Sequence, residues 1–235
     1  MASLQKKLSE MLPENREKIA QLVKEYGDKI ISQVTVKQAY GGMRGVKSLI
    51  CDTSLVEPDK GLVIRGRPIL DLVDKLPEEV FFLLLTGDLP DETGLKSLQK
   101  DLRERQDVPQ YVWDVLSAMG EDAHPMTMLS TAILVMQRDS VFAREYRRGI
   151  SKTEYWKPVL EDALRIVARL PEIAAFIYRK RFNKGQRIEP RVDLDWAGNF
   201  AHMLGITDLT GNFADLIRLY MVLHSDHEGC DRKAW

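Results

Sequence analysis

The stretch Pro125–Met136, which reads PMTMLSTAILVM, carries apolar side chains on most sides of a helix. Proline is well tolerated at the first position of a helix, so Pro125 marks where this helix begins. A helix that lacks a broad polar face is typical of the centre of a fold. We therefore expect Pro125–Met136 to be a buried central helix against which other parts of the chain pack.

Helix signals recur on both sides of this stretch. Apolar residues repeat with the helical period, prolines or aspartates stand at the starts, and glycines stand at the ends. Pro13 and Pro171 are each expected to start a new helix, and Asp91 to cap one. The predicted helices cover residues 4–12, 13–26, 77–86, 91–102, 125–136, 158–170, 171–182, 194–204 and 213–223.

One region near the N-terminus has the pattern of strands. Leu49–Val56 and Leu62–Arg65 are rich in apolar and β-branched residues, and they flank Glu57–Gly61, which contains Pro, Asp and Gly. Those three residue types favour a turn between paired strands. The predicted fold class is therefore mainly α, a multi-helix domain with one small β-hairpin near the N-terminus.

Composition excludes several classes of function. The 235 residues include 34 Lys+Arg and 35 Asp+Glu, which gives a net charge of −1. Nucleic-acid arms and polybasic membrane patches need a one-sided charge, so neither partner is expected. The longest apolar run, Val80–Leu85, is too short to cross a membrane. Two cysteines and the absence of a secretory signal favour a cytoplasmic protein.

The stretch Arg218–Gly229 is the most informative for function. His224 and His227 lie three residues apart at the end of an apolar helix, where they would share one helical face beside Asp226. Three interpretations stay open. The pair could bind a metal with Glu228 and Cys230, could grip a substrate carboxylate as cationic imidazoles, or could merely be favoured by the helix dipole.

Two other segments could bind an anion. Tyr40–Lys47 has three glycines in five residues, which permit close backbone approach, and Arg44 could clamp a phosphate or carboxylate. The alternative is a tight turn. Arg144–Tyr155 is a basic loop before a helix, and its alternative is a solvated loop. The isolated His124 and His202 are expected to serve as core or cap residues.

The segment His224–Gly229, preceded by Arg218-Leu219-Tyr220, resembles the citrate synthase family. Tyr40–Gly45 resembles the N-terminal signature of that family, and the long N-terminal part is similar to its mitochondrial (Si-type) branch. Further segments match in order, namely 52–54, 58–62, 84–87, 124–126, 149–151, 155–156, 194–196, 199–200 and 203–205. The resemblance covers residues 1–229, so these are expected to form the N-terminal part of a citrate synthase domain. Residues 230–235 do not match.

The resemblance implies an activity. The family is an acyltransferase family that condenses acetyl-CoA with oxaloacetate to give citrate and CoA at the entry to the tricarboxylic acid cycle. It works as a homodimer and uses no metal and no prosthetic group. Acetyl-CoA and oxaloacetate are thus the expected partners. The branch also makes the mitochondrial matrix a less favoured alternative to the cytoplasm.

The resemblance also assigns roles to four residues. His227 matches an imidazole that binds oxaloacetate, with His224 as its neighbour. Arg44 matches an arginine that helps hold a CoA phosphate. At a second such position Lys152 replaces the family's arginine, which keeps the charge but loses the bidentate fork.

The family's catalytic residues do not match this sequence. One His that stabilises the enol, a second His and the catalytic Asp lie beyond the position of Gly229, so no catalytic residue is assigned here. We expect the chain to be a truncated synthase that is inactive alone. The alternatives are a non-catalytic helical fragment that binds a full-length subunit or CoA, and a 2-methylcitrate synthase.

Overall fold

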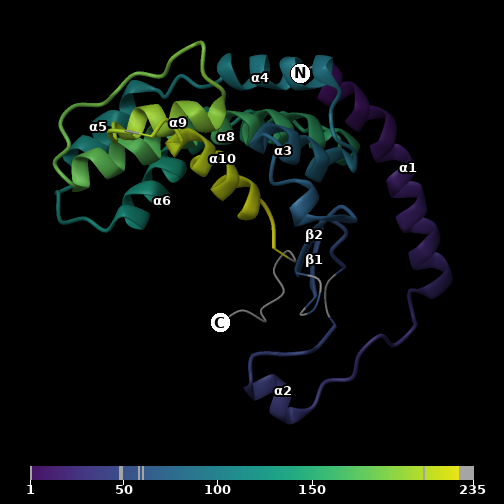
Figure 1. Cartoon of the computed structure of the whole chain (residues 1–235). Helices are drawn as coiled ribbons and strands as arrows, with labels where there is room; N and C mark the ends of the chain where they lie inside the picture. The colour runs from purple at the N-terminus through teal and green to yellow at the C-terminus, as the bar shows by residue number, and fades with distance from the viewer. Residues whose placement is uncertain (1, 48–49, 58, 60, 209, 228–235) are drawn as a thin grey trace.

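The computed structural model describes residues 2–47, 50–57, 59, 61–208 and 210–227. Over these residues the chain forms ten α-helices, three 3-10 helices and one small antiparallel sheet (Figure 1). The α-helices are α1 (Ala2–Tyr26), α2 (Val36–Tyr40), α3 (Pro77–Thr86), α4 (Glu92–Arg103), α5 (Gln110–Ala118), α6 (Pro125–Met136), α7 (Val141–Arg147), α8 (Trp156–Arg181), α9 (Trp196–Leu204) and α10 (Phe213–Leu223). The 3-10 helices are η1 (Ile69–Asp71), η2 (Gln137–Asp139) and η3 (Lys152–Glu154). The mainly α class is confirmed.

The sheet confirms the predicted hairpin and adds a strand to it. β1 (Ser54–Glu57) pairs with β2 (Gly61–Ile64), with Ser54 opposite Ile64. A third strand, β3 (Arg67–Pro68), pairs with the other side of β2. Two residues are too few to show a strand pattern in the sequence. Proline is accepted in β3 because an edge strand leaves one row of backbone groups unpaired.

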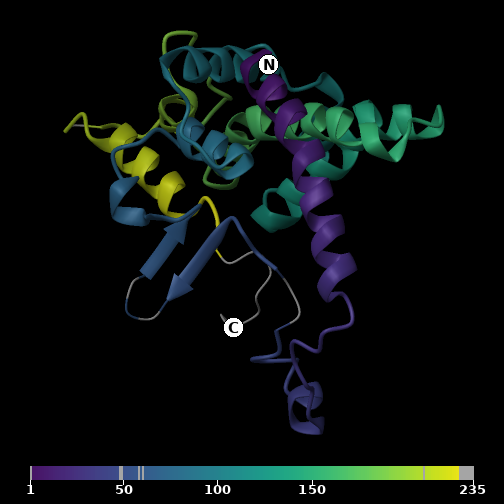
Figure 2. The same cartoon turned by 90° about the vertical axis from the view of Figure 1, so that its right-hand side faces the viewer.

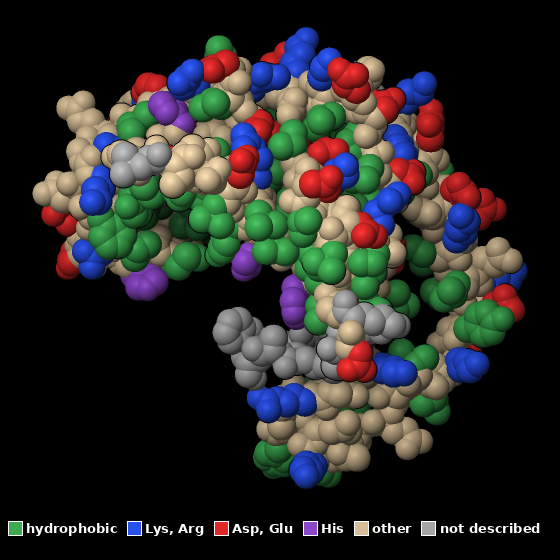
Figure 3. All heavy atoms as spheres, in the orientation of Figure 1, with side chains coloured by type: hydrophobic (Ala, Val, Ile, Leu, Met, Phe, Trp, Pro, Cys, Tyr) green, Lys and Arg blue, Asp and Glu red, His purple; other side chains and the backbone are tan. Residues whose placement is uncertain are grey.

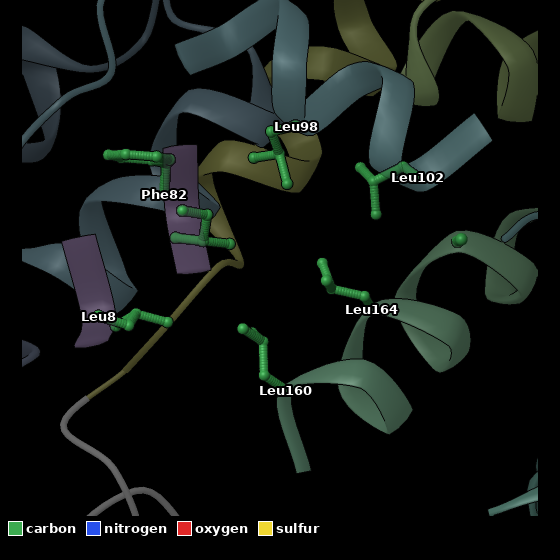
Figure 4. Packing of buried hydrophobic residues seen from close by; sticks show 8 residues of the cluster. Leu8, Phe82, Leu98, Leu102, Leu160 and Leu164 are labelled. Carbon is green, nitrogen blue, oxygen red and sulfur yellow. The ribbon is translucent and has the colours of Figure 1, made fainter. Parts of the chain in front are cut away.

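The hydrophobic core is organised along α8. Its first half packs with α1, α3 and α4 in a cluster that includes Leu164 and Phe82, and in Figure 4 the side chains of Leu8, Leu98 and Leu160 point toward the same centre. Its second half packs with α5 and α6 in a separate cluster of buried residues. The single helix α8 therefore joins two clusters. The members of the second cluster are Val112, Trp113, Leu116, Met128, Ala132, Met136, Ile173 and Ile177.

Several predicted helix ends are confirmed by their caps. The carboxylate of Asp91 accepts the Gly94 N–H at 2.6 Å, and this caps α4. Asp195 caps α9 in the same way, through the Gly198 N–H at 2.6 Å, so this helix begins at Trp196 and not at the predicted residue 194. Gly87 ends α3 with a left-handed φ of 84°, which costs glycine little.

Pro13 and Pro171 do not start new helices, which corrects the prediction. α1 runs through Pro13 and α8 runs through Pro171. A proline inside a helix loses one backbone hydrogen bond at a cost of about 3 kcal/mol. Tertiary packing offsets this cost, because Pro171 is buried between the two clusters and Leu12 packs on the core in the turn before Pro13.

The prediction that Pro125–Met136 is buried on most sides is also wrong. One face of α6 is buried, through Met128 and Ala132. The opposite face is open, with Met126 58% and Leu134 72% exposed. Apolar side chains gather on the face of the molecule that carries α5 and α6 (Figure 3). This helix is thus apolar all round without being central, which is typical of a surface that meets a partner.

The second half of α1 extends away from the helical body. Figure 2 shows α1 running down past the sheet to a linker and α2, which lies apart from the other helices. The apolar side chains of this half are exposed, and they include Ile19, Leu22, Val23 and Tyr26. None of the described helices is both long and apolar enough to span a bilayer.

Replacing Leu164 by alanine tests the core. Leu164 is 0% exposed at the centre of the first cluster. The L164A variant should lose about 2–5 kcal/mol of unfolding free energy, because both the buried side chain and its packing are lost. Urea unfolding measures this. L22A, at a leucine of α1 that is 53% exposed, is the control and should change stability by less than about 1 kcal/mol. Equal losses in the two variants would contradict this view of the core.

Candidate functional site

α10 delivers the histidine-containing segment to the sheet. Val222, near its C-terminal end, is fully buried with Ile64 of β2 and Leu83 of α3. α10 also packs along α9. In Figure 1 it descends from the helical body toward β1 and β2. The end of α10 is therefore fixed where the helices meet the sheet.

An ion pair also holds α10 in place. The guanidinium of Arg218 donates to Oδ2 of Asp195 through Nε and Nη2, both at 2.9 Å. The other oxygen of Asp195 caps α9 through Gly198. The carboxylate of Asp195 thus caps the start of α9 and also holds α10 through the ion pair. The paired charges keep the pKa of Arg218 above its ordinary value, although burial alone would lower it.

His224 is the residue at which α10 ends. Its ring Nδ1 lies 2.8 Å from the carbonyl oxygen of Tyr220, and its ring stacks on Tyr220 with centroids 4.1 Å apart. Because a carbonyl can only accept, Nδ1 carries the hydrogen. Nε2 of the exposed ring takes no part in this hydrogen bond.

His227 lies beyond the helix, so the two imidazoles do not share a helical face as predicted. α10 stops at Leu223, and the hydroxyl of Ser225 donates to the carbonyl of Val222 at 2.9 Å. The backbone N–H of His227 donates to the carboxylate of Asp226 at 2.9 Å. This competing local hydrogen bonding replaces the next helical turn. The side chain of His227 is exposed.

The segment after α10 lies close to Cys51, just before β1. The Thr53 hydroxyl, which is 3.3 Å from the thiol, lowers the pKa of Cys51, and the charge of Asp226 opposes that effect. Glu228 and Cys230, which the metal interpretation needs, lie outside the described residues. Among the described residues, no three His, Cys, Asp or Glu side chains are grouped as metal ligands.

Arg44 lies in a tight turn directly after α2. The turn uses left-handed backbone at Gly42, Met43 and Gly45, with φ of 76°, 63° and 73°. Arg44 is exposed. Both the turn and the anion-binding interpretation fit this geometry. Because α2 lies apart from the helical body in both views, Arg44 is presented at the end of an arm (Figures 1 and 2).

Lys152 lies in the helical body, on η3 between α7 and α8. The Ser151 hydroxyl accepts the Thr153 N–H at 3.4 Å, and the Thr153 carbonyl accepts from Arg16 of α1 at 3.0 Å. Lys152 itself is exposed. The turn is braced by three mutually contacting aromatic rings, those of Phe142, Tyr146 and Tyr155. Lys152 is thus a solvent-facing cation on a well-supported turn.

The remaining histidines and the basic tract Arg179–Arg181 have structural roles or none. His124 caps α6, since its Nδ1 accepts the Met126 N–H at 3.2 Å, and His202 is half-buried on α9. The guanidinium of Arg179 donates to the carbonyl oxygens of Lys184, Gln186 and Leu204. The tract is therefore a charged helix end that closes the following loop.

The structure also reveals a buried carboxylic acid that the sequence analysis missed. Glu78 is 1% exposed, whereas acids in a first helical turn normally face solvent. Burial raises its pKa. It lines a cavity of about 260 Å³ together with Glu172 of α8. Burial likewise raises the pKa of Glu172 to about 7. No sequence signal separates Glu78 from its neighbour Glu79.

Comparisons with known proteins agree on one family. The family model "Citrate synthase, C-terminal domain" matches residues 42–231. The mitochondrial citrate synthases of Neurospora crassa and Saccharomyces cerevisiae are 40% and 38% identical over 97% of this chain. The mitochondrial 2-methylcitrate synthase of Yarrowia lipolytica is 39% identical over 96% of it. The chain spans about half the length of these relatives, 50%, 49% and 51% respectively.

Solved structures give the same result. Citrate synthase from Pyrobaculum aerophilum has a TM-score of 0.72 and 26% identity over 85% of this chain and 51% of its own. The Thermoplasma acidophilum enzyme, solved with carboxymethyl coenzyme A and oxaloacetate, has a TM-score of 0.67 over 84% of this chain and 49% of its own. At 19% identity, the comparison with the Thermoplasma enzyme shows a similar fold alone.

Fold and relatives together define a helical domain from a family of acyltransferases. The chain belongs to the citrate synthase family.

The raised pKa of Glu172 predicts a pH dependence of stability. Its pKa is about 7 in the folded chain against an ordinary value of 4.5. Between these values the folded chain holds a proton that the unfolded chain releases, so the unfolding free energy falls as pH rises from 5 to 8. This group contributes at most about 3 kcal/mol to the fall.

The E172Q variant removes the titrating group. Urea unfolding at pH 5 and pH 8 should show a smaller loss of stability in E172Q than in the unsubstituted protein. E121Q, at an exposed glutamate distant in sequence from the cavity residues, is the matched control and should keep the full loss. Identical losses in all three proteins would contradict the effect of burial on Glu172.

Proposed function

We propose that this chain carries the oxaloacetate-binding and CoA-binding elements of a citrate synthase. The observation that supports this most directly is the segment His224–His227, which matches the family and is held at the end of α10 with both imidazoles exposed. The whole protein would condense acetyl-CoA with oxaloacetate and release citrate and CoA.

The two imidazoles suit a dicarboxylate. His227 is proposed to bind oxaloacetate directly, with His224 beside it. His224 is the residue at which α10 ends, and an imidazole N–H there can donate a hydrogen bond to a carboxylate oxygen. The hydrogen bond to Tyr220 fixes the ring of His224 and directs Nε2 outward.

Arg44 and Lys152 are proposed to hold the phosphates of CoA. Both are exposed cations on turns, where a highly charged ligand can reach them. Arg44 can form a bidentate pair with phosphate, whereas Lys152 supplies a point charge. The Thermoplasma structure carries a CoA analogue and oxaloacetate together, which supports assigning both ligands to this family's fold.

A homodimer is part of the proposal. The open face of α6 and the end of α8 form a shallow apolar groove of about 210 Å³ around Met126, Leu129, Ile177 and Phe182. Exposed apolar side chains in such numbers are typical of an interface. The family's dimeric state agrees with this surface.

Residues 1–235 alone are proposed not to form citrate. The family's enol-stabilising His, second His and catalytic Asp match no residue of the chain, so general acid–base catalysis lacks its groups. No metal or prosthetic group is proposed. The alternative function is that of a non-catalytic helical fragment that binds CoA or a full-length subunit. Both this alternative and the main proposal expect the chain to bind CoA without turnover.

The acyl preference and the compartment are also proposals. 2-Methylcitrate synthase activity stays an alternative, since the Yarrowia relative is about as similar to this chain as the citrate synthases are. The names of these relatives favour the mitochondrial matrix. The cytoplasmic expectation finds no support in the comparisons.

Ligand-induced stabilisation tests the proposed function. CoA should raise the melting temperature of the 1–235 chain, because a ligand that binds only the folded state stabilises it. The R44A/K152A variant should lose most of that rise, whereas K184A, at an exposed lysine outside the proposed site, should keep it. A thiol-release assay with acetyl-CoA and oxaloacetate should show no turnover. Turnover by the chain alone, or an unchanged CoA effect in R44A/K152A, would contradict the proposal.

A further inference from the structure

Two cations from distant parts of the chain meet at η3. The guanidinium of Arg16, on α1, donates through Nη2 to the carbonyl oxygen of Thr153 at 3.0 Å. Thr153 directly follows Lys152, so this hydrogen bond places the guanidinium beside the residue whose ammonium is proposed to hold a CoA phosphate. Arg16 and Lys152 are both exposed, and a ligand can therefore reach them from solvent.

Both cations keep donors that the protein does not use. A guanidinium has five N–H donors, and within the part of the chain that the structure describes Arg16 uses Nη2 alone, toward Thr153. The ammonium of Lys152 has no hydrogen bond or ion pair with any described residue. An anion at η3 would thus meet two positive charges that still have donors to offer.

The acidic residues nearest in sequence do not neutralise these charges. Glu14 forms an ion pair with Lys18 at 2.7 Å. Glu154 forms one with Lys157. Glu17 directly follows the arginine, and adjacent residues of a helix do not face each other. The positive charge at η3 is therefore left to a ligand.

The same turn also carries two hydroxyl groups. Oγ of Ser151 and Oγ1 of Thr153 are 2.9 Å apart. One hydroxyl hydrogen lies between the two oxygens, so the other hydroxyl keeps its hydrogen for a further acceptor. The turn thus brings together guanidinium, ammonium and hydroxyl donors, and all three suit the oxygens of a phosphate.

We propose that Arg16 is a further phosphate-binding residue of the proposed CoA site and supplies the guanidinium fork that Lys152 lacks. The inference rests on the proposed function, because it assigns the same phosphate to Lys152. A guanidinium can pair two N–H donors with two phosphate oxygens, whereas an ammonium acts as a point charge. Arg16 lies outside residues 42–231, which the family model matches, so the family's pattern does not assign it this role.

The dissociation constant of CoA, measured by isothermal titration calorimetry on the 1–235 chain at pH 7.5, tests the inference. R16A should raise this constant about tenfold, because a charged hydrogen-bonded contact with phosphate is lost. K152R places a guanidinium at residue 152, so adding R16A to K152R should raise the constant by about threefold or less. R148A, which removes an exposed arginine paired with Glu145 at 3.0 Å, is the matched control and should change it less than about twofold.

The outcomes separate this inference from the proposed function. Unchanged CoA binding in R16A, together with weakened binding in K152A, would overturn the inference and leave the proposed CoA site standing. Equal effects of R16A with and without K152R would also overturn it, because Arg16 would then act through its hydrogen bond to the turn and not on the phosphate. If the unsubstituted chain did not bind CoA, the proposed function would fail and the inference with it.

Discussion

The first turn of α9 is held by polar contacts to three other helices, and the placement of the candidate site depends on them. The carboxylate of Asp195 caps the helix and binds Arg218 of α10. The N–H of Trp196 donates to Glu78 of α3, and its indole donates to the Val167 carbonyl of α8 at 3.0 Å. These contacts are directional, so they fix orientation where apolar packing alone fixes only proximity.

This arrangement explains why the imidazoles stand where they do. Arg218 and Val222 lie one turn apart on α10, the first paired with α9 and the second buried against the sheet and α3. With both anchored, α10 can only end beside β1, and His224 and His227 emerge there. This arrangement costs free energy, since Glu78 is buried beside α9 with one carboxylate oxygen that has no hydrogen-bond partner.

Local signals in the sequence predict much of the fold. Asp91 and Gly87 act within a few residues of themselves, so their caps follow from the sequence. Tertiary packing decides the rest. It carries α8 through Pro171 and leaves one face of α6 open, and neither outcome is visible in a short window of sequence. The motif around His224 locates the candidate site in the sequence. The geometry of the site could not be predicted in the same way, because it depends on where α10 ends, and there the hydroxyl of Ser225 competes for a helical carbonyl.

Hydrogen–deuterium exchange in the R218Q variant tests most directly whether the Arg218–Asp195 pair positions the candidate site. If this pair positions α10, amides in its last turn should exchange about tenfold faster or more in R218Q, while those of α6 stay unchanged. R148Q, which breaks an exposed ion pair with Glu145, should leave α10 as it is. Unchanged exchange at the end of α10 in R218Q would contradict a positioning role of the Arg218–Asp195 pair, because burial of Val222 would then suffice to hold the histidine segment.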